Sequence, residues 1–283
     1  MLGGNSCVTL HSEISQRERL PSPLALITCN MENYNELKER YSRQMLLPQI
    51  GESGQQKLSE GSVLLVGAGG LGSPAGLYLA AAGVGKIGIA DGDVVSRSNL
   101  ARQVAHFTSD LGRKKVESIG EKLHAINPNV ELTLLDRFID QGSARSILKN
   151  YDFIIDCTDS LCSKYMINDA CVELGKPCCI GGVFRFGAQL LTVVPGSACY
   201  RCVFPDASPT EGEMSCAISG VMGGVVGMLG CMQAVEAVKF ITGCGTLLTD
   251  RLLIADTLNM QFHTVSVARD SLCPTCSKHK QNT

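Results

Sequence analysis

Short apolar runs alternate with amphipathic stretches of helical length between Ser62 and Gly181. Apolar runs of four to six residues predict strands over 62–66, 86–91, 131–135, 153–156 and 177–181. Stretches with helical spacing separate these runs, over 72–82, 114–126, 143–149 and 163–174. Strands that alternate with helices form a mostly parallel sheet with helices on both faces. We therefore expect an α/β fold with a Rossmann-like, doubly wound sheet.

The hydrophobic pattern changes after Gly181. Alternating apolar and polar residues predict strands over 188–194, 251–256 and 261–267, as is typical of antiparallel pairs. A stretch without periodicity covers 203–219, and a connection of that length inside a compact domain is usually functional or mobile. We expect a mixed, antiparallel C-terminal half attached to the parallel half.

One run, Met214–Val235, holds no charged side chain and approaches the length of a bilayer span. It nevertheless carries Ser215, Ser219 and Gln233, and it continues directly into a charged segment with helical spacing. A buried helix explains this run better than a membrane span, so no membrane association is predicted. A subunit contact is one place where such a helix becomes buried.

Composition and charge limit the class of protein. The chain has 283 residues, 45% of them hydrophobic, which suffices for one large α/β domain or two small ones. The formal net charge is −2 with both signs scattered, so nucleic acid is not a predicted partner. Fourteen cysteines occur without a secretory signal, and Glu13 and Glu18 are unlike a transit peptide. Reduced thiols and a cytoplasmic location are therefore expected.

A glycine-rich turn, Gly67-Ala-Gly-Gly-Leu-Gly72, joins the first predicted strand to the first predicted helix. Its backbone N–H groups at a helix start suit a phosphate, and Asp91 at the end of the next strand suits a ribose hydroxyl. The same turn serves dinucleotides at least as often as ATP. An NAD-dependent oxidoreductase therefore stays an alternative at this point.

Three side chains beyond the second strand favour a triphosphate: Asn99, Arg102 and Lys115. Arg offers a planar fork and Lys a point charge for phosphate oxygens, although each residue alone is more often a solvated surface group. Asp159 follows the strand over 153–156, where a carboxylate can hold Mg²⁺ beside phosphates. The alternative for Asp159 is a place in the cap of the next helix.

Cysteines point to a metal site and to a candidate nucleophile. The pairs Cys199/Cys202 and Cys273/Cys276 supply four thiolates, the ligand set of structural Zn²⁺, and two adjacent dithiols are the alternative. Their wide separation predicts a clamp that holds the C-terminal tail on the domain. Cys216 precedes a glycine-rich helix, where a lowered pKa would suit a nucleophile. From the residues alone, an inert cysteine is favoured there.

Six ordered motifs, from about Arg40 to Cys276, resemble those of the MoeB/ThiF group of ubiquitin-activating-like enzymes. They are Arg40-Tyr-Ser-Arg43-Gln, Gly67 to Gly72, Ser98 to Gln103, Asp156-Cys-Thr-Asp159, Cys199-Tyr-Arg-Cys202 and Cys273-Pro-Thr-Cys276. Within the group, the chain is most similar to eukaryotic members that serve molybdopterin synthase and tRNA thiolation. The resemblance implies ATP-dependent adenylation of the C-terminal glycine of a ubiquitin-like sulfur carrier ending in Gly-Gly. It also implies ATP, Mg²⁺ and Zn²⁺ as cofactors.

The resemblance also assigns roles to individual residues. Arg102 and Arg43 are expected to be catalytic, Arg43 by reaching into the site of a second subunit in a homodimer. Cys216 matches a cysteine that takes part in thioester or persulfide chemistry in relatives. Asp159 is expected to position Mg²⁺. The residues expected to contact ATP are Gly67, Gly69, Gly70, Gly72, Asp91, Asp93, Ser98, Asn99, Leu100, Ala101, Arg102, Lys115, Asp159 and Ser160.

Departures from the family pattern and the domain limits complete the sequence prediction. Ser160 replaces the usual Asn, and Lys164 replaces the usual Arg. No rhodanese domain follows Cys276, so we expect a separate sulfur donor, a rhodanese or a cysteine desulfurase, unless the chain is a fragment or a short form. A non-catalytic module that docks ubiquitin-like proteins is the remaining alternative. The predicted limits are a flexible extension over 1–30, a helical segment over 31–61 that includes a helix over 33–43 capped by Asn33, a nucleotide-binding half over 62–181, a partner-binding and zinc half over 182–276, and a tail over 277–283.

Overall fold

The computed structural model describes residues 36–205 and 220–277. From Arg43 onward the chain forms one compact unit, and the segment before it is a separate unit with residues 36–40 in a helix. The helix expected over 33–43 therefore agrees at 36–40. Its expected cap, Asn33, lies outside the described residues, as do the predicted extension and Cys216.

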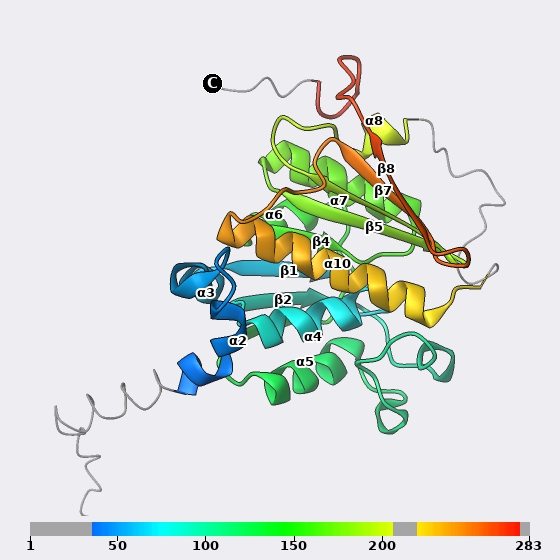
Figure 1. Ribbon diagram of the computed structural model, residues 1–283. Coiled ribbons are helices and arrows are strands. Elements are labelled where there is room, and N and C mark those ends of the chain that lie inside the picture. The colour runs from blue at the N-terminus through cyan, green and yellow to red at the C-terminus, as the bar shows by residue number, and fades with distance from the viewer. Residues whose placement is uncertain (1–35, 206–219, 278–283) are drawn as a thin grey trace, which may run out of the picture. The chain divides into compact units, whose positions relative to one another are not determined.

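Eight strands of the described chain form one sheet in the order β3-β2-β1-β4-β5-β6-β7-β8 (Figure 1). The first five in this order pair in parallel, and β5 to β8 pair as antiparallel neighbours. This arrangement confirms the doubly wound, mostly parallel sheet with an antiparallel C-terminal half. The strands are β1 (Ser62–Val66), β2 (Lys86–Ala90), β3 (Glu131–Leu135), β4 (Phe153–Asp156), β5 (Cys178–Phe184), β6 (Gly187–Val193), β7 (Arg251–Asp256) and β8 (Gln261–Ser266).

The helices cover both faces of the parallel half. Residues of β1 show this directly, because neighbouring side chains of a strand point to opposite faces. Val63 and Leu65 belong to a core with α4, α5 and α10, whereas Leu64 and Val66 belong to a core with α6 and α7. The helices are α2 (Ser42–Met45), α3 (Gly51–Glu60), α4 (Gly72–Ala82), α5 (Lys115–Ile126), α6 (Ala144–Leu148), α7 (Leu161–Leu174), α8 (Tyr200–Val203) and α10 (Gly223–Thr242), with 3₁₀ turns η1 (Arg97–Asn99) and η2 (Thr108–Asp110).

Helix α10 is long and apolar enough to cross a membrane by length and composition, and it packs in the core of the described chain instead. It contacts α4, α3 and the strands β4, β5 and β6. Its buried Glu236 accepts hydrogen bonds from Thr192 Oγ1 (2.6 Å) and the Leu248 N–H (2.9 Å). A buried carboxylate with fixed protein partners suits a core helix, as the sequence predicted for this run.

The strand and helix bounds agree closely with the hydrophobic pattern. β1, β3, β4, β7 and α4 begin and end at the predicted residues, and the other predicted strands and α5, α6 and α7 differ by one to three positions at their ends. The buried helix predicted from the run 214–235 agrees less closely, because α10 begins at Gly223 and ends at Thr242. β5 shows the largest extension, because it continues to Phe184 to pair with β6 along its whole length. The short η1, η2 and α8 have no apolar periodicity of their own and were not predicted.

We expect Gly230→Ala to destabilise the fold through a clash between α10 and α4. A Cβ atom on Gly230 would lie 2.4 Å from the Leu71 carbonyl oxygen and 2.6 Å from Pro74 Cγ. The free energy of unfolding from urea titration should fall by about 1–3 kcal/mol. Gly227 is the matched control on the same helix, since a Cβ there meets nothing within 4 Å. Gly227→Ala should be neutral or stabilising by up to about 1 kcal/mol, and equal losses in both variants would refute this packing.

Candidate functional site

A cavity of about 320 Å³ lies at the carboxyl ends of β1, β2 and β4, where the sequence placed a ligand. Polar and charged residues line one part of it, and apolar residues line another. The predicted contacts that the cavity brings together are Gly67, Gly69, Gly70, Asp91, Asp93, Arg102, Lys115 and Asp159. The additional lining residues include Gln103, Phe138, Ile139, Thr158, Lys164, Met166, Val183, Val221 and Val226.

The glycine turn depends on close backbone approaches that exclude side chains. Gly67 has a φ of 106°, a conformation that residues with a Cβ rarely adopt. A Cβ on Gly72 would lie 2.0 Å from the Gly67 carbonyl oxygen, and one on Gly70 would lie 2.5 Å from Val226 Cγ1. Gly72 therefore closes the turn against the start of α4 without lining the cavity itself.

Two buried side chains hold the peptide groups of Ala68 inside this turn. The Ala68 N–H donates to Asp91 Oδ2 (2.8 Å). The Ala68 carbonyl lies 2.9 Å from His106 Nε2, and His106 Nδ1 lies 2.8 Å from Ser118 Oγ. Because a carbonyl only accepts, Nε2 carries the proton and Nδ1 accepts from the Ser118 hydroxyl. His106 was not predicted, since a single histidine in a loop gave no signal.

The cations of the cavity already have anionic or carbonyl partners. Lys115 Nζ lies 2.7 Å from Asp93 Oδ2 and 4.0 Å from Asp91 Oδ2, and its side chain is buried. Arg102 is half-buried and donates from Nη1 to the Ser98 carbonyl (3.0 Å). A phosphate could replace Asp93 at Lys115, because the Asp93 side chain is 54% exposed and free to turn to solvent.

Lys164 lines the cavity, and its ammonium group is fully engaged with the protein. It donates to the carbonyls of Gly181 (2.6 Å) and Thr158 (2.7 Å), and it lies 3.4 Å from Asp156 Oδ2. An ammonium group has three donors, and these three partners use them. Lys164 thus joins the end of β4 to the middle of β5 at the cavity wall. Asp159 also lines the cavity and is exposed.

Several predicted contacts lie beside the cavity or away from it. Asn99 Oδ1 caps η1 by accepting from the Ser96 N–H (3.1 Å). Ser160 caps α7, since its Oγ accepts from the Ser163 N–H (3.1 Å). Ser98, Leu100 and Ala101 are likewise not among the lining residues, and Arg43 is exposed on α2.

The apolar wall of the cavity was missed by the sequence prediction. Phe138 and Ile139 follow β3, and Met166 lies on α7. The position of Phe138 and Ile139 just beyond the carboxyl end of a parallel strand is a signal that could have indicated these two residues. Val221 and Val226 come from the start of α10, whose approach to the glycine turn is a tertiary feature without a local signal.

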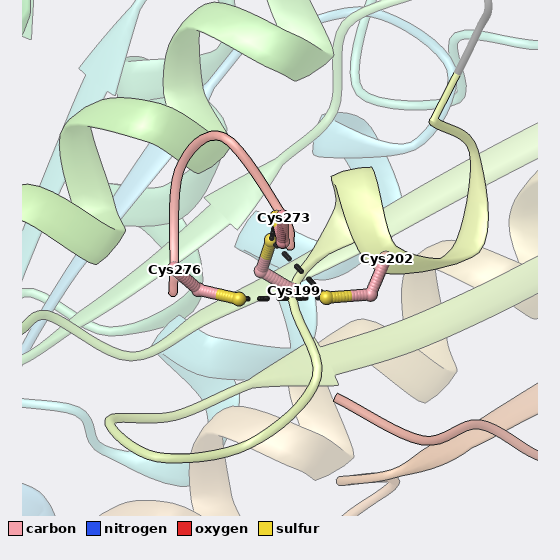
Figure 2. A group of neighbouring side chains, drawn as sticks. All are labelled: Cys199, Cys202, Cys273 and Cys276. Carbon is pink, nitrogen blue, oxygen red and sulfur yellow. Dashed lines mark hydrogen bonds between the residues drawn. The ribbon is translucent and has the colours of Figure 1, made fainter. Parts of the chain in front are cut away.

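The four predicted metal-binding cysteines converge into one cluster (Figure 2). All four Sγ atoms lie within 4.8 Å of one another, with separations of 3.4 Å (Cys202–Cys276), 3.6 Å (Cys199–Cys273) and 3.9 Å (Cys199–Cys202). A tetrahedral ion with Zn–S bonds of about 2.3 Å separates its ligands by about 3.8 Å. The cluster is therefore compatible with zinc, and its contacts within and between the pairs fit one four-thiolate set better than two separate dithiols.

Asp169 on α7 holds both cysteine pairs in place. Arg201, inside the first pair, donates from Nε (2.9 Å) and Nη2 (2.8 Å) to the two oxygens of its carboxylate. Thr275, inside the second pair, donates from Oγ1 to Asp169 Oδ1 (2.9 Å). The neighbouring Asn168 Oδ1 accepts from the Tyr200 N–H (2.8 Å). One turn of α7 thus fixes the backbone that carries all four thiols.

We expect the fold to lose stability as the pH falls below the usual histidine pKa of 6.5, because His106 is buried in the neutral form. Burial lowers the pKa of His106, outweighing the hydrogen bond to Ala68, which favours the protonated ring. The unfolded chain therefore binds a proton first, so this stability is complete above about pH 6.5 and declines toward the lower folded pKa. Urea titrations at pH 7.5 and 5.5 measure the difference.

His106→Gln should flatten that pH dependence, and His124→Gln, at an exposed position, should retain it. An unchanged pH dependence in His106→Gln would show that another group is responsible.

We expect Asp169→Asn to weaken metal binding by about 10-fold or more, because an outer partner of a metal site commonly contributes that much. Competition with a chromophoric chelator measures zinc affinity directly. Glu173→Gln is the matched control, since Glu173 lies on the same helix and pairs with Arg145 at the surface. Equal zinc affinity in both variants would contradict the role of Asp169.

Comparisons with known proteins agree with this geometry. The chain is 42% identical over 241 residues to "Adenylyltransferase and sulfurtransferase MOCS3" of Drosophila grimshawi, covering 84% of this chain and 54% of that protein. It is 39% identical over 240 residues to "SAMP-activating enzyme E1" of Haloferax volcanii, covering 85% and 89%. The chain therefore spans about half the length of the MOCS3 relatives that it matches.

Among solved structures, E. coli MccB with AMPCPP and MccA has a TM-score of 0.75 at 22% identity, covering 91% of this chain and 82% of that chain. This likeness supports the fold alone. Residues 41–275 match the ThiF family, a range that contains the glycine turn, the cavity and three of the four clustered cysteines, and that ends one residue before Cys276. With this match over most of its length, the chain belongs to the ThiF family.

Proposed function

We propose that this chain uses ATP to adenylate the C-terminal glycine of a ubiquitin-like sulfur-carrier protein that ends in Gly-Gly. The observation that carries the proposal is the cavity, where a glycine turn, two cations and an exposed carboxylate converge in a ThiF-family fold. Relatives at about 40% identity are named adenylyltransferases or activating enzymes. The adenylated carrier would then be ready for thiocarboxylation in molybdenum cofactor biosynthesis or tRNA thiolation.

The proposed reaction needs positioning and charge stabilisation more than proton transfer. An oxygen of the ionised glycine carboxylate attacks the α-phosphorus of ATP, and the bond to the β-phosphate bridging oxygen breaks as pyrophosphate leaves. The carboxylate is already ionised at neutral pH, so no general base is required. Arg102 and Lys115 would stabilise the charge that develops on the phosphate oxygens.

The remaining predicted contacts take places consistent with this role. Asp91 would orient the ribose while it holds the glycine turn through Ala68. Asp93 would release Lys115 to the phosphates. Asp159 would hold Mg²⁺, which supplies further positive charge to the triphosphate when bound. Asn99 and Ser160 would shape the cavity rim through the caps described above, and Ser98, Leu100 and Ala101 lie on the same loop between Ser96 and Arg102.

An exposed apolar surface supports docking of a protein partner on the C-terminal half. β8 is the last strand of the sheet, and all six of its residues are exposed. Large hydrophobic side chains with exposures of 38–72% lie on β5 to β8 and their turns, on both faces of the sheet, since Ile254 and Val265 point to one face and Phe262 to the other. They are Phe184, Phe186, Ile254, Leu258, Met260, Phe262 and Val265. A sheet edge with apolar side chains is a surface that a ubiquitin-like partner could extend or cover.

Further parts of the proposal concern sulfur, assembly and location. Cys216 would take part in a covalent step with the activated carrier, since it lies five positions before Val221, a residue of the cavity wall. A separate rhodanese or cysteine desulfurase would supply sulfur. Arg43, exposed on α2, would complete the site of a second subunit in a homodimer. We propose that the protein acts in the cytoplasm.

We expect Arg102→Ala to reduce carrier-dependent ATP:pyrophosphate exchange by about 100-fold or more, because a charged donor to the transition state is lost. Labelled pyrophosphate incorporated into ATP measures the rate with a panel of ubiquitin-fold proteins ending in Gly-Gly. Arg97→Ala is the matched control, since Arg97 lies on the same loop and does not line the cavity. Exchange at the unmodified rate in Arg102→Ala would refute the assigned phosphate contact.

A further inference from the structure

Gln103 is a buried side chain of the cavity wall with an unused hydrogen-bonding group. It is 4% exposed, and its amide lies against Gly69 of the glycine turn. Its backbone is fixed, because its N–H donates to the Asn99 carbonyl (2.9 Å) and its carbonyl accepts from the His106 N–H (3.0 Å). Among the described residues, its Oε1 is one of two buried side-chain atoms without a partner, and the other, Ser73 Oγ, is not in the cavity wall.

Other buried glutamines of the described chain do have partners. Gln55 Oε1 accepts from Gln44 Nε2 (2.6 Å), and Gln55 Nε2 donates to the Ala82 carbonyl (3.1 Å). Gln233 Nε2 donates to the Asp156 carbonyl (2.8 Å). A buried amide oxygen without a partner destabilises the fold, and an apolar side chain of similar shape would avoid that cost. The unpaired amide oxygen of Gln103 therefore adds nothing to the stability of the fold, and a methionine of similar shape could pack in its place.

The chemistry of the missing partner follows from the atom that is free. Oε1 is an acceptor, so its partner must carry a hydrogen. Ionised phosphate oxygens carry none, which excludes them as partners for Oε1. The nucleotide brings two O–H sources into this cavity: the ribose hydroxyls, and water bound to its magnesium ion. The adenine amine also carries hydrogens, but the Gln103 amide lies against the glycine turn, which suits the phosphates and not the base.

We propose that Gln103 is a ligand-binding residue whose Oε1 accepts a hydrogen bond from an O–H group of the bound magnesium nucleotide. This inference rests on the proposed function, since it takes the nucleotide as the ligand. Binding would supply the partner that the free protein lacks, so the cost of the unpaired amide is offset only in the complex. Gln103 thereby contributes to the affinity of the protein for the nucleotide.

The test compares stability and affinity in Gln103→Met, a replacement of similar shape without hydrogen-bonding groups. Calorimetry with the magnesium complex of a non-hydrolysable ATP analogue should show an affinity about 3- to 10-fold lower than that of the unmodified chain, the range expected for one neutral hydrogen bond. The melting temperature of the free protein should stay equal or rise. Gln55→Met is the matched control, since Gln55 is buried, fully bonded and absent from the cavity wall. It should lower the melting temperature and leave nucleotide affinity unchanged.

Analogues identify the source of the hydrogen. With 2′-deoxy or 3′-deoxy nucleotide, the affinity difference between the unmodified chain and Gln103→Met should vanish for the analogue that lacks the donor hydroxyl. If magnesium-bound water is the donor, the difference should instead persist with both analogues and vanish when magnesium is omitted from the buffer. A difference that persists in all three conditions would overturn the proposal, because the donor would then be neither group.

Three other outcomes also test the inference. Equal nucleotide affinity in Gln103→Met and the unmodified chain would overturn the inference and leave the proposed function standing. A melting temperature that falls as far as in Gln55→Met would assign Gln103 a structural role and overturn it as well. An unmodified chain that binds no nucleotide, with or without magnesium, would overturn both the inference and the proposed function.

Discussion

The hydrogen bonds at Ala68 join three segments that lie far apart in the sequence. Its N–H donates to Asp91, which directly follows β2, and its carbonyl accepts from His106. The other ring nitrogen of His106 accepts from the Ser118 hydroxyl on α5. The glycine turn has no polar side chains that could hydrogen-bond to its own backbone, so its shape depends on these outside partners. A cavity that binds phosphate through backbone N–H groups needs those groups fixed before the ligand arrives. The cost is a buried carboxylate and a buried neutral histidine, each acceptable only because it is bonded.

Helix α7 brings the cavity and the four-cysteine cluster onto one rigid element. Lys164 ties the end of β4 to the middle of β5 at the cavity wall, and Asp169 holds both cysteine pairs little more than one turn later. The Arg that is usual in the family at position 164 offers five donors, whereas the three donors of this lysine are used by the protein itself. Arg102 and Lys115 are therefore the cations proposed to contact phosphate in this chain.

The sequence predicted the sheet, most element bounds and the convergence of the glycine turn with Asp91, Arg102, Lys115 and Asp159. These features follow from local periodicity and from the rule that ligands bind at the carboxyl ends of parallel strands. The features that the sequence did not predict depend on tertiary packing. Gln103, His106 and the wall from α10 gain their roles only through packing between distant segments, and no local pattern records it. The roles assigned to individual site residues stay predictions, and Cys216 lies outside the described residues.

The four-cysteine cluster has a topological consequence for the C-terminal half. Cys199 and Cys273 are 74 positions apart, and the chain between them contains α10, β7 and β8. An ion that joins these positions closes a ring in the denatured chain and removes conformational freedom, as a covalent cross-link would. For a ring of this size the chain-entropy estimate is about 4 kcal/mol, a large share of the net stability of an ordinary domain. The segment that carries β7 and β8 is thus attached to α7 at both of its ends. This attachment restricts the motion of the exposed sheet edge even where its own strands have few packing partners.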